Sequence, residues 1–171
     1  AGLHFSPDIF FFFLKKGISR LFTTLHVGAG TFMPVKSNTM DGHNMHAEVM
    51  NISVEFLEQL LEKINSKIIT VGTTSTRTLE SIYWMGNKII NQPNINHEQL
   101  KVTQWEPYEG MKRHSAEAAV SALIEWIKQH NETELSIETQ IIIAPCYKFG
   151  IVKGLITNFH QPQSTLLLLV S

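Results

Sequence analysis

Apolar residues recur at helical spacing in several parts of the chain. The clearest case follows Ser53, where they fall at every third or fourth position and Ser53 is placed to cap the helix. The run IFFFFL follows Ser-Pro, a typical helix start, and is too dense in apolar residues for one face, so we expect this helix to be buried on most sides. The predicted helices cover residues 7–16, 53–65, 76–85, 115–129 and 162–169.

Shorter apolar stretches predict strands between these helices. They cover residues 20–27, 46–52, 67–71, 140–143 and 155–159. Because strands and helices alternate, we expect an α/β domain, a layered mixed sheet with some parallel strands and flanking helices. A single domain over 1–171 is expected, incomplete at both ends, since an apolar run stops at the last residue. The polar stretch that opens at Asn91 predicts an inserted arm or subdomain over 91–136.

Composition and charge fit a globular cytoplasmic protein. Hydrophobic residues make up 43% of the chain and charged residues 17%, which is enough for a core. The net charge of -1 gives no overall basic field for nucleic acid, although a local patch can still bind it. The single cysteine, Cys146, suits a reducing compartment. The apolar runs are too short to cross a membrane, so no membrane association is expected.

The first candidate site is a glycine turn, LHVGAGTF, after the strand predicted over 20–27. Gly28 and Gly30 allow backbone amides to approach a ligand closely, and Thr31 adds a hydroxyl. A tight turn without a ligand has the same pattern. Pro34 prevents the helix that a dinucleotide-binding fingerprint requires at this point, so the turn would hold a nucleotide in some other way.

The second candidate is the hydroxyl-rich sequence VGTTSTRTLE, where a strand meets a helix. Helix N–H groups favour anions there, and the four consecutive hydroxyls of residues 73–76 lie at this junction. Thr74 or Ser75 would also serve as the helix cap. Arg77 and Glu80 share a helix face, so they form either a surface ion pair or an anchor for an anionic ligand.

Histidines mark two further candidates. His46 and Glu48 share a face of the strand predicted over 46–52, where general acid–base chemistry, a metal site and a plain edge strand are the alternatives. The sequence TNFHQP places Asn158 and His160 at the end of another strand, a usual position for ligands in open α/β sheets. Simple helix entry before Pro162 is the competing explanation.

Five segments in order resemble one known family. They read AGLHF, TLHVGAGTF, HNMHAE, VGTTSTRTLES and LITNFHQP, followed by STLLLLVS. Together they are similar to the S-adenosylmethionine:tRNA ribosyltransferase-isomerases of queuosine biosynthesis. The resemblance covers residues 1–85 and 140–171.

The resemblance implies that S-adenosylmethionine donates its ribosyl group to an aminomethyl-deazaguanine base in tRNA. Adenine and methionine leave, and the sugar rearranges to the epoxide of epoxyqueuosine. The residues it implies for proton transfer are His26, His46, Glu48 and His160. Those implied for cofactor binding are Gly28, Gly30, Thr31, Thr73, Thr74, Arg77 and Asn158, with Arg77 near the methionine carboxylate. No metal is implied. The chain would be the main domain of such a protein without its inserted β-barrel.

Some residues depart from the family pattern. Ala144-Pro145-Cys146-Tyr147 stands where Tyr-Pro-Gly-Tyr is usual, and Gly150 and Lys153 follow where a basic and an acidic residue are usual. These departures concern the tRNA side of the site more than the cofactor side. They leave open a divergent paralogue that binds S-adenosylmethionine or RNA without this activity. A methyltransferase is a further alternative. The sequence does not determine the oligomeric state.

The segment over 91–136 carries its own candidate chemistry. Its aromatic and basic residues fit RNA binding, and packing on the chain's own core is the alternative. They are Trp105, Tyr108, Lys112, Arg113 and His114.

Overall fold

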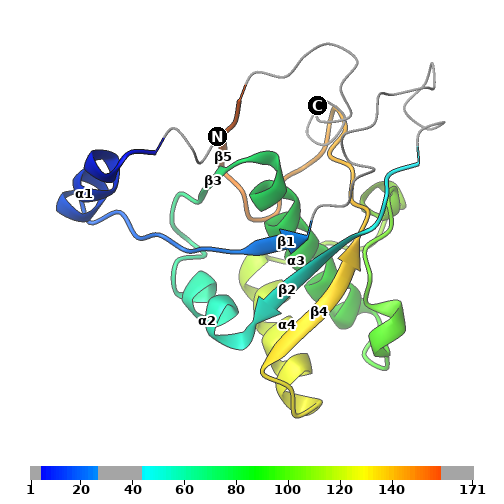
Figure 1. The fold of residues 1–171 in the computed structure, drawn as a ribbon. Helices are drawn as coiled ribbons and strands as arrows, with labels where there is room; N and C mark the ends of the chain where they lie inside the picture. Colours follow the sequence, from blue (N-terminus) through cyan, green and yellow to red (C-terminus); the bar gives the residue numbers. More distant parts are fainter. Residues whose placement is uncertain (1–4, 27–43, 159–171) are drawn as a thin grey trace.

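The computed structural model describes residues 5–26 and 44–158 (Figure 1). Their strands form two small sheets, an antiparallel one in the order β1-β2-β4 and a parallel pair β3-β5. Four α-helices accompany them within these residues. The expected α/β class is therefore confirmed, with some parallel pairing, but the strands divide between two sheets. The predicted helix over 162–169 lies outside the described residues.

The antiparallel sheet consists of β1 (Thr24–His26), β2 (Glu48–Ser53) and β4 (Glu134–Thr139). Along β2 and β4 buried and more exposed residues alternate, as expected for a sheet with one face on the core. Met50 pairs with Leu25 on one side and with Ile137 on the other. This register turns Glu48 inward with Met50, because alternate residues of a strand share a face.

The parallel pair joins β3 (Ile69–Val71) to β5 (Gly154–Ile156). Directly after β3 comes α3 (Thr73–Asn91), which starts three residues earlier and ends six later than predicted. Gly72 caps it with a φ of 91°, a conformation that favours glycine, and its N–H donates to the Ile156 carbonyl (2.8 Å). The prediction that Thr74 or Ser75 caps this helix is therefore wrong.

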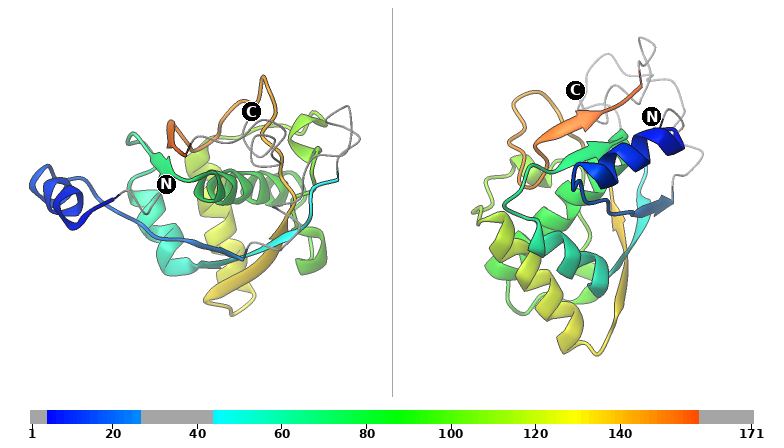
Figure 2. Two further views of the ribbon diagram at one scale, coloured as in Figure 1. Left: turned by 45° about the horizontal axis from the view of Figure 1, so that its top comes forward. Right: turned by 90° about the vertical axis from the view of Figure 1, so that its left-hand side faces the viewer.

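The core lies where α3 packs against α4 (Ala116–Gln129), with α2 (Val54–Glu62) beside α4. Figure 2 shows α3 passing between the antiparallel sheet and the chain segments around β5. Gly86 lets α3 and α4 approach closely, because a Cβ there would lie 2.0 Å from the Ala119 carbonyl oxygen. The largest fully buried apolar side chains are those of Trp84, Met50, Ile52, Leu57, Leu60, Ile82, Met85, Leu100, Leu123, Ile127 and Leu135.

Two predicted helices match their observed bounds closely. α2 begins after Ser53, whose Oγ accepts a hydrogen bond from the Phe56 N–H (3.1 Å), and α4 is capped in the same way by Ser115. Within α4 the buried side is formed by Ala119, Val120, Leu123, Ile124, Trp126 and Ile127. Ala118 lies on the exposed side of this helix.

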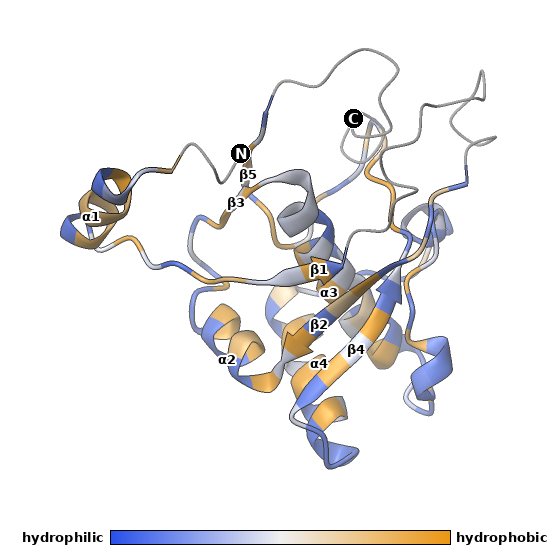
Figure 3. Ribbon diagram, in the orientation of Figure 1, coloured by the Kyte–Doolittle hydropathy of each residue, from blue (hydrophilic) through white to orange (hydrophobic). Residues whose placement is uncertain are grey.

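The helix α1 (Pro7–Lys15) matches its predicted bounds within one residue, but its environment differs from the prediction. None of its residues is buried, and the side chains of Phe11, Phe12 and Leu14 are more than half exposed. Figures 1 and 3 show this apolar helix apart from the other helices, at the end of an extended segment. The prediction of burial on most sides is therefore wrong, because a dense apolar sequence reports hydrophobicity and not the presence of a neighbour.

Two strand predictions differ most from the structure. The strand predicted over 20–27 forms only from Thr24, and the strand predicted over 140–143 lies earlier, as β4. After Thr139 the chain stays extended and pairs with an irregular segment, with Gln140 N–H donating to the Val102 carbonyl (2.8 Å). Short 3₁₀ helices occupy His97–Gln99 and Glu106–Tyr108, on either side of that segment.

Candidate functional site

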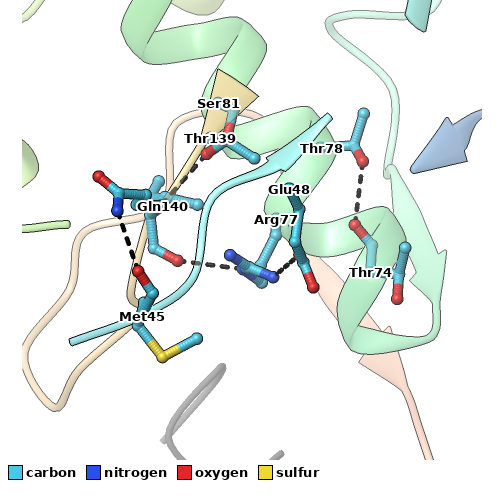
Figure 4. A network of polar contacts seen from close by, with 9 residues as sticks. Met45, Glu48, Thr74, Arg77, Thr78, Ser81, Thr139 and Gln140 are labelled. Atoms are coloured by element: carbon cyan, nitrogen blue, oxygen red, sulfur yellow. Dashed lines mark hydrogen bonds and ion pairs between the residues drawn. The ribbon is translucent and has the colours of Figure 1, made fainter. Parts of the chain in front are cut away.

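A buried ion pair links β2 to α3. The Arg77 guanidinium contacts the Glu48 carboxylate through Nη1, and both side chains are 1% exposed (Figure 4). Arg77 Nε donates to the Ile141 carbonyl (3.0 Å), which ties the pair to the chain after β4. Burial lowers the pKa of Arg77, and the charge of Glu48 acts in the opposite direction. The two residues come from two of the predicted sites, which the fold therefore brings together.

One NH₂ group of the Arg77 guanidinium takes no part in the contacts with Glu48 and Ile141. Its Nη2 is buried and has no hydrogen-bond partner within the described residues. A buried donor without a partner is uncommon in folded proteins, because desolvating it is unfavourable. The guanidinium is therefore a candidate for contact with an anion or a carbonyl group.

Glu80, expected to pair with Arg77 or to anchor a ligand, forms no ion pair with Arg77 within the described part of the chain. Its fully buried carboxylate accepts hydrogen bonds from the backbone N–H groups of Gly150 (2.8 Å), Ile151 (3.0 Å) and Val152 (2.9 Å). The Tyr147 hydroxyl donates a fourth (2.8 Å). Glu80 thus fixes the segment that leads from the divergent Ala144–Tyr147 sequence into β5.

The hydroxyl-rich sequence forms the first two turns of α3. Thr76 Oγ1 lies 2.7 Å from Thr70 Oγ1, and Ser75 Oγ donates to the Val71 carbonyl (3.0 Å), so these hydroxyls serve the fold. Thr73 is buried and Thr74 is half-buried. Within residues 5–26 and 44–158 neither hydroxyl group makes a hydrogen bond, although the Thr74 carbonyl accepts one from Thr78. The α3 N-terminus therefore keeps two hydroxyls beside its first N–H groups, where an anion is favoured.

A polar hollow of about 550 Å³ lies beside the start of β2. His46 is exposed and lines it, while Glu48, two residues on, points into the core. The expected shared face of these residues is therefore not observed, because β2 begins only at Glu48. The residues lining the hollow are Asn44, Met45, His46, Ala47, Thr103, Gln104, Trp105, Glu109 and Gln140.

Two glutamines fix the wall of this hollow. The Gln104 side-chain oxygen accepts from the Met45 N–H (2.8 Å), and Gln140 Nε2 donates to the Met45 carbonyl (3.0 Å). Figure 4 shows the contact between Gln140 and Met45. Met45 is thereby held on both sides, and His46 follows it directly in the sequence. No local pattern in the sequence marks these glutamines as site residues, since the bonds join residues 59 and 95 positions apart.

The other predicted site residues lie elsewhere or outside the described residues. His26 is exposed, and its Nε2 lies 3.4 Å from Asn51 Nδ2 on the outer face of the antiparallel sheet, opposite to Glu48. Asn158 is exposed after β5. The predicted residues outside the described part are Gly28, Gly30, Thr31 and His160. Among the described residues no three His, Cys, Asp or Glu side chains gather as metal ligands would.

These features define a class of protein, an α/β domain with a polar hollow and a buried charged pair between a strand and a helix. The chain belongs to the family of queuosine biosynthesis proteins, whose family model matches residues 1–171. The resemblance noted in the sequence is thus confirmed. No helix in the described residues combines the length and the apolar character that a membrane crossing needs.

Curated relatives carry one name. The S-adenosylmethionine:tRNA ribosyltransferase-isomerase of a Francisella tularensis subsp. holarctica strain is 35% identical over 173 residues, and that of Allorhizobium ampelinum is 38% identical over 173 residues. Each match covers the whole of this chain and 38% or 37% of the relative. The chain therefore spans less than two fifths of the length of these relatives. No solved structure matches it.

Proposed function

We propose that this protein transfers the ribosyl group of S-adenosylmethionine to the aminomethyl-deazaguanine base of a tRNA and isomerises it to epoxyqueuosine. The observation that carries the proposal is His46 on the wall of the polar hollow, next to the buried pair of Glu48 and Arg77. The names of the relatives support it. The described residues supply one part of the site.

His46 is the proposed proton-transfer group. The reaction needs a base near the carbon activated by the sulfonium and an acid for the departing adenine, and imidazole serves either role near neutral pH. His46 is exposed towards the hollow. Glu48 is paired with Arg77, and its proposed role is to hold that guanidinium in position. His160 is proposed as the second proton-transfer group, and His26 remains a weaker candidate because it lies on the outer face of its sheet.

The start of α3 is the proposed cofactor cradle. Thr73 and Thr74 would bind the methionine carboxylate together with the first N–H groups of the helix, and Arg77 Nη2 offers a further buried donor. The glycine turn with Gly28, Gly30 and Thr31 completes this proposal, with Asn158 beyond β5. S-adenosylmethionine acts as a substrate, and no step requires a metal.

The deciding experiment incubates the full-length protein with S-adenosylmethionine and tRNA that carries the aminomethyl-deazaguanine base. Adenine released only in the presence of that tRNA, measured by chromatography, supports the proposal. S-adenosylhomocysteine without adenine would point to a methyltransferase instead. Tight cofactor binding without either product would indicate a paralogue that lacks the activity.

A histidine pair sharpens this test. His46→Gln is expected to lower kcat for adenine release by about 100-fold or more, the usual contribution of general acid–base catalysis. His97→Gln is the matched control, since His97 is also exposed but lies in a 3₁₀ helix and does not line the hollow. Equal rates in both variants would remove His46 from the reaction.

A further inference from the structure

Four aromatic side chains form a row that starts at the polar hollow. Trp105 lines the hollow and lies 5.6 Å from Tyr108 between ring centres. Tyr108 is followed by Tyr147 (6.1 Å) and Tyr147 by Phe149 (5.1 Å). We name this set the aromatic row. It joins the segment over 91–136 to the segment that Glu80 holds before β5.

The hydroxyl groups of the two tyrosines fix the row to the protein interior. The Tyr108 hydroxyl donates to the Ile142 carbonyl (3.1 Å) and accepts from the Ala144 N–H (2.7 Å). The Tyr147 hydroxyl donates to Glu80 and accepts from Trp84 Nε1 (2.7 Å). The polar ends thus point into the protein and hold the rings in place. Ring positions set in advance lower the entropy that binding costs.

The outer part of the row stays open to solvent. Tyr108 is 40% exposed and Phe149 41% exposed, although both are large apolar rings. Packing on the chain's own core therefore accounts for only part of their surface. Exposed aromatic rings next to a polar site commonly mark a binding surface.

Positive charge accompanies the row. The Arg113 guanidinium lies 5.4 Å from the centre of the Trp84 ring, and its charge acts on the nearby Tyr147 hydroxyl. Lys148 is exposed between Tyr147 and Phe149 in the sequence. Three acidic groups lie near the row: Glu109 is exposed and lines the hollow, whereas Glu80 and Glu106 are buried, with Glu106 paired to Lys88. Rings with cations beside them match single-stranded nucleic acid, whose bases stack and whose phosphates are anionic.

We propose that the aromatic row binds the unpaired tRNA nucleotides next to the target base, with their bases stacked on Tyr108 and Phe149. This inference rests on the proposed function, because it takes the hollow beside His46 as the place that receives the target base. The row then sets where the anticodon loop enters. It also assigns a role to the segment in which the chain departs from its family pattern.

The test measures the Kd of the full-length protein for a fluorescently labelled anticodon stem–loop of the substrate tRNA. Phe149→Leu keeps an apolar side chain but removes the ring, and it is expected to raise the Kd at least about fivefold, near 1 kcal/mol. Phe149→Trp keeps a stacking ring and is expected to retain the affinity. Phe11→Leu is the matched control, because Phe11 is an exposed phenylalanine on α1, which Figure 1 shows apart from the other helices.

The outcomes separate the two proposals. If the wild type releases adenine and Phe149→Leu leaves the Kd for RNA unchanged, the RNA-binding role of the aromatic row is overturned. The proposed function would then still stand. A wild type that neither binds the RNA nor releases adenine would overturn both. The Kd for S-adenosylmethionine is expected to be the same in all variants. If Phe149→Leu raised this Kd as much as it raised the Kd for RNA, the protein would be generally damaged, and the proposed role of the aromatic row would be contradicted.

Discussion

Glu48 at the start of β2 and Arg77 in α3 form an ion pair that is almost completely shielded from water. Glu48→Leu is expected to lower the free energy of unfolding by about 3–5 kcal/mol, because it leaves the guanidinium charge buried without this carboxylate. The double variant Glu48→Leu/Arg77→Met is expected to be more stable than Glu48→Leu alone. Urea unfolding followed by tryptophan fluorescence measures both.

The exposed pair of Lys128 and Glu58 is the control, with about half of each side chain exposed. Glu58→Gln is expected to change the free energy of unfolding by less than about 1 kcal/mol. A similar loss for Glu48→Leu and Glu58→Gln would contradict the importance of burial. A rise of the Kd for S-adenosylmethionine in Arg77→Met would separately support a role for Arg77 in cofactor binding.

Glu80→Gln is expected to loosen the segment from Gly150 to Val152. Both carboxylate oxygens accept backbone hydrogen bonds there, so the side-chain NH₂ group of a glutamine would face at least one N–H donor in either orientation. Hydrogen exchange of these amides is expected to accelerate about tenfold or more, since a hydrogen bond to a charged group contributes about 1.5–3 kcal/mol. Glu55→Gln on the exposed side of α2 is the control and should leave them unchanged.

Tyr147 is expected to make stability depend on pH in the alkaline range. Burial first, and then the charge of Glu80, raise the pKa of Tyr147 above its ordinary value of 10.0. A raised folded-state pKa means that the contribution to stability is complete below pH 10.0 and is lost as the pH rises above it.

Tyr147→Phe separates this effect from the hydrogen bonds. The variant is expected to be less stable than wild type near neutral pH, because the Trp84 Nε1 donor loses its partner. Its free energy of unfolding should nevertheless fall less steeply above pH 10.0. Parallel curves for the two proteins would show that the Tyr147 hydroxyl does not titrate with unfolding.

Gly86→Ala is expected to reverse the usual effect of this substitution. In an exposed helix interior, alanine is more favourable than glycine by about 0.5–1 kcal/mol. Here the new Cβ would meet the backbone of Ala119 at 2.0 Å, so α3 and α4 must separate and the protein is expected to lose about 1–3 kcal/mol. Ala118→Gly on the exposed side of α4 is the control, with a loss of about 1 kcal/mol from helix propensity alone. Thermal unfolding checks both, and a stabilised Gly86→Ala protein would contradict the close packing.

The sequence predicts those parts of the fold that local spacing encodes. α2 and α4 have clear apolar periods and serine caps, so their starts are found within one residue. The strand predicted over 140–143 lies too late, because the run of isoleucines at 141–143 is a stronger signal than the alternation in 134–139 that forms β4. Burial of α1 was wrong, since apolar content does not say what lies beside a helix.

The candidate site shows the same division. The hydroxyl-rich start of α3 is visible in the sequence, because strand, glycine and hydroxyls are contiguous. The pairing of Arg77 with Glu48 is not visible in the sequence, since they lie 29 positions apart and Glu80 is the nearer candidate partner on the same helix face. The Glu80 carboxylate instead accepts hydrogen bonds from backbone amides 70 to 72 positions away. Such contacts depend on tertiary packing and leave no local period.

The parallel pairing of β3 with β5 has a consequence for synthesis of the chain. Thr70 lies 84 positions before Gly154, and the Gly72 N–H at the start of α3 is held by Ile156. A ribosome that has completed α3 and α4 has not yet made β5, and closing so long a loop is slow. The nascent chain can therefore pack its helices early, but the ligand cradle proposed at the start of α3 becomes complete only when β5 has emerged. Binding of S-adenosylmethionine would then distinguish finished chains from interrupted ones.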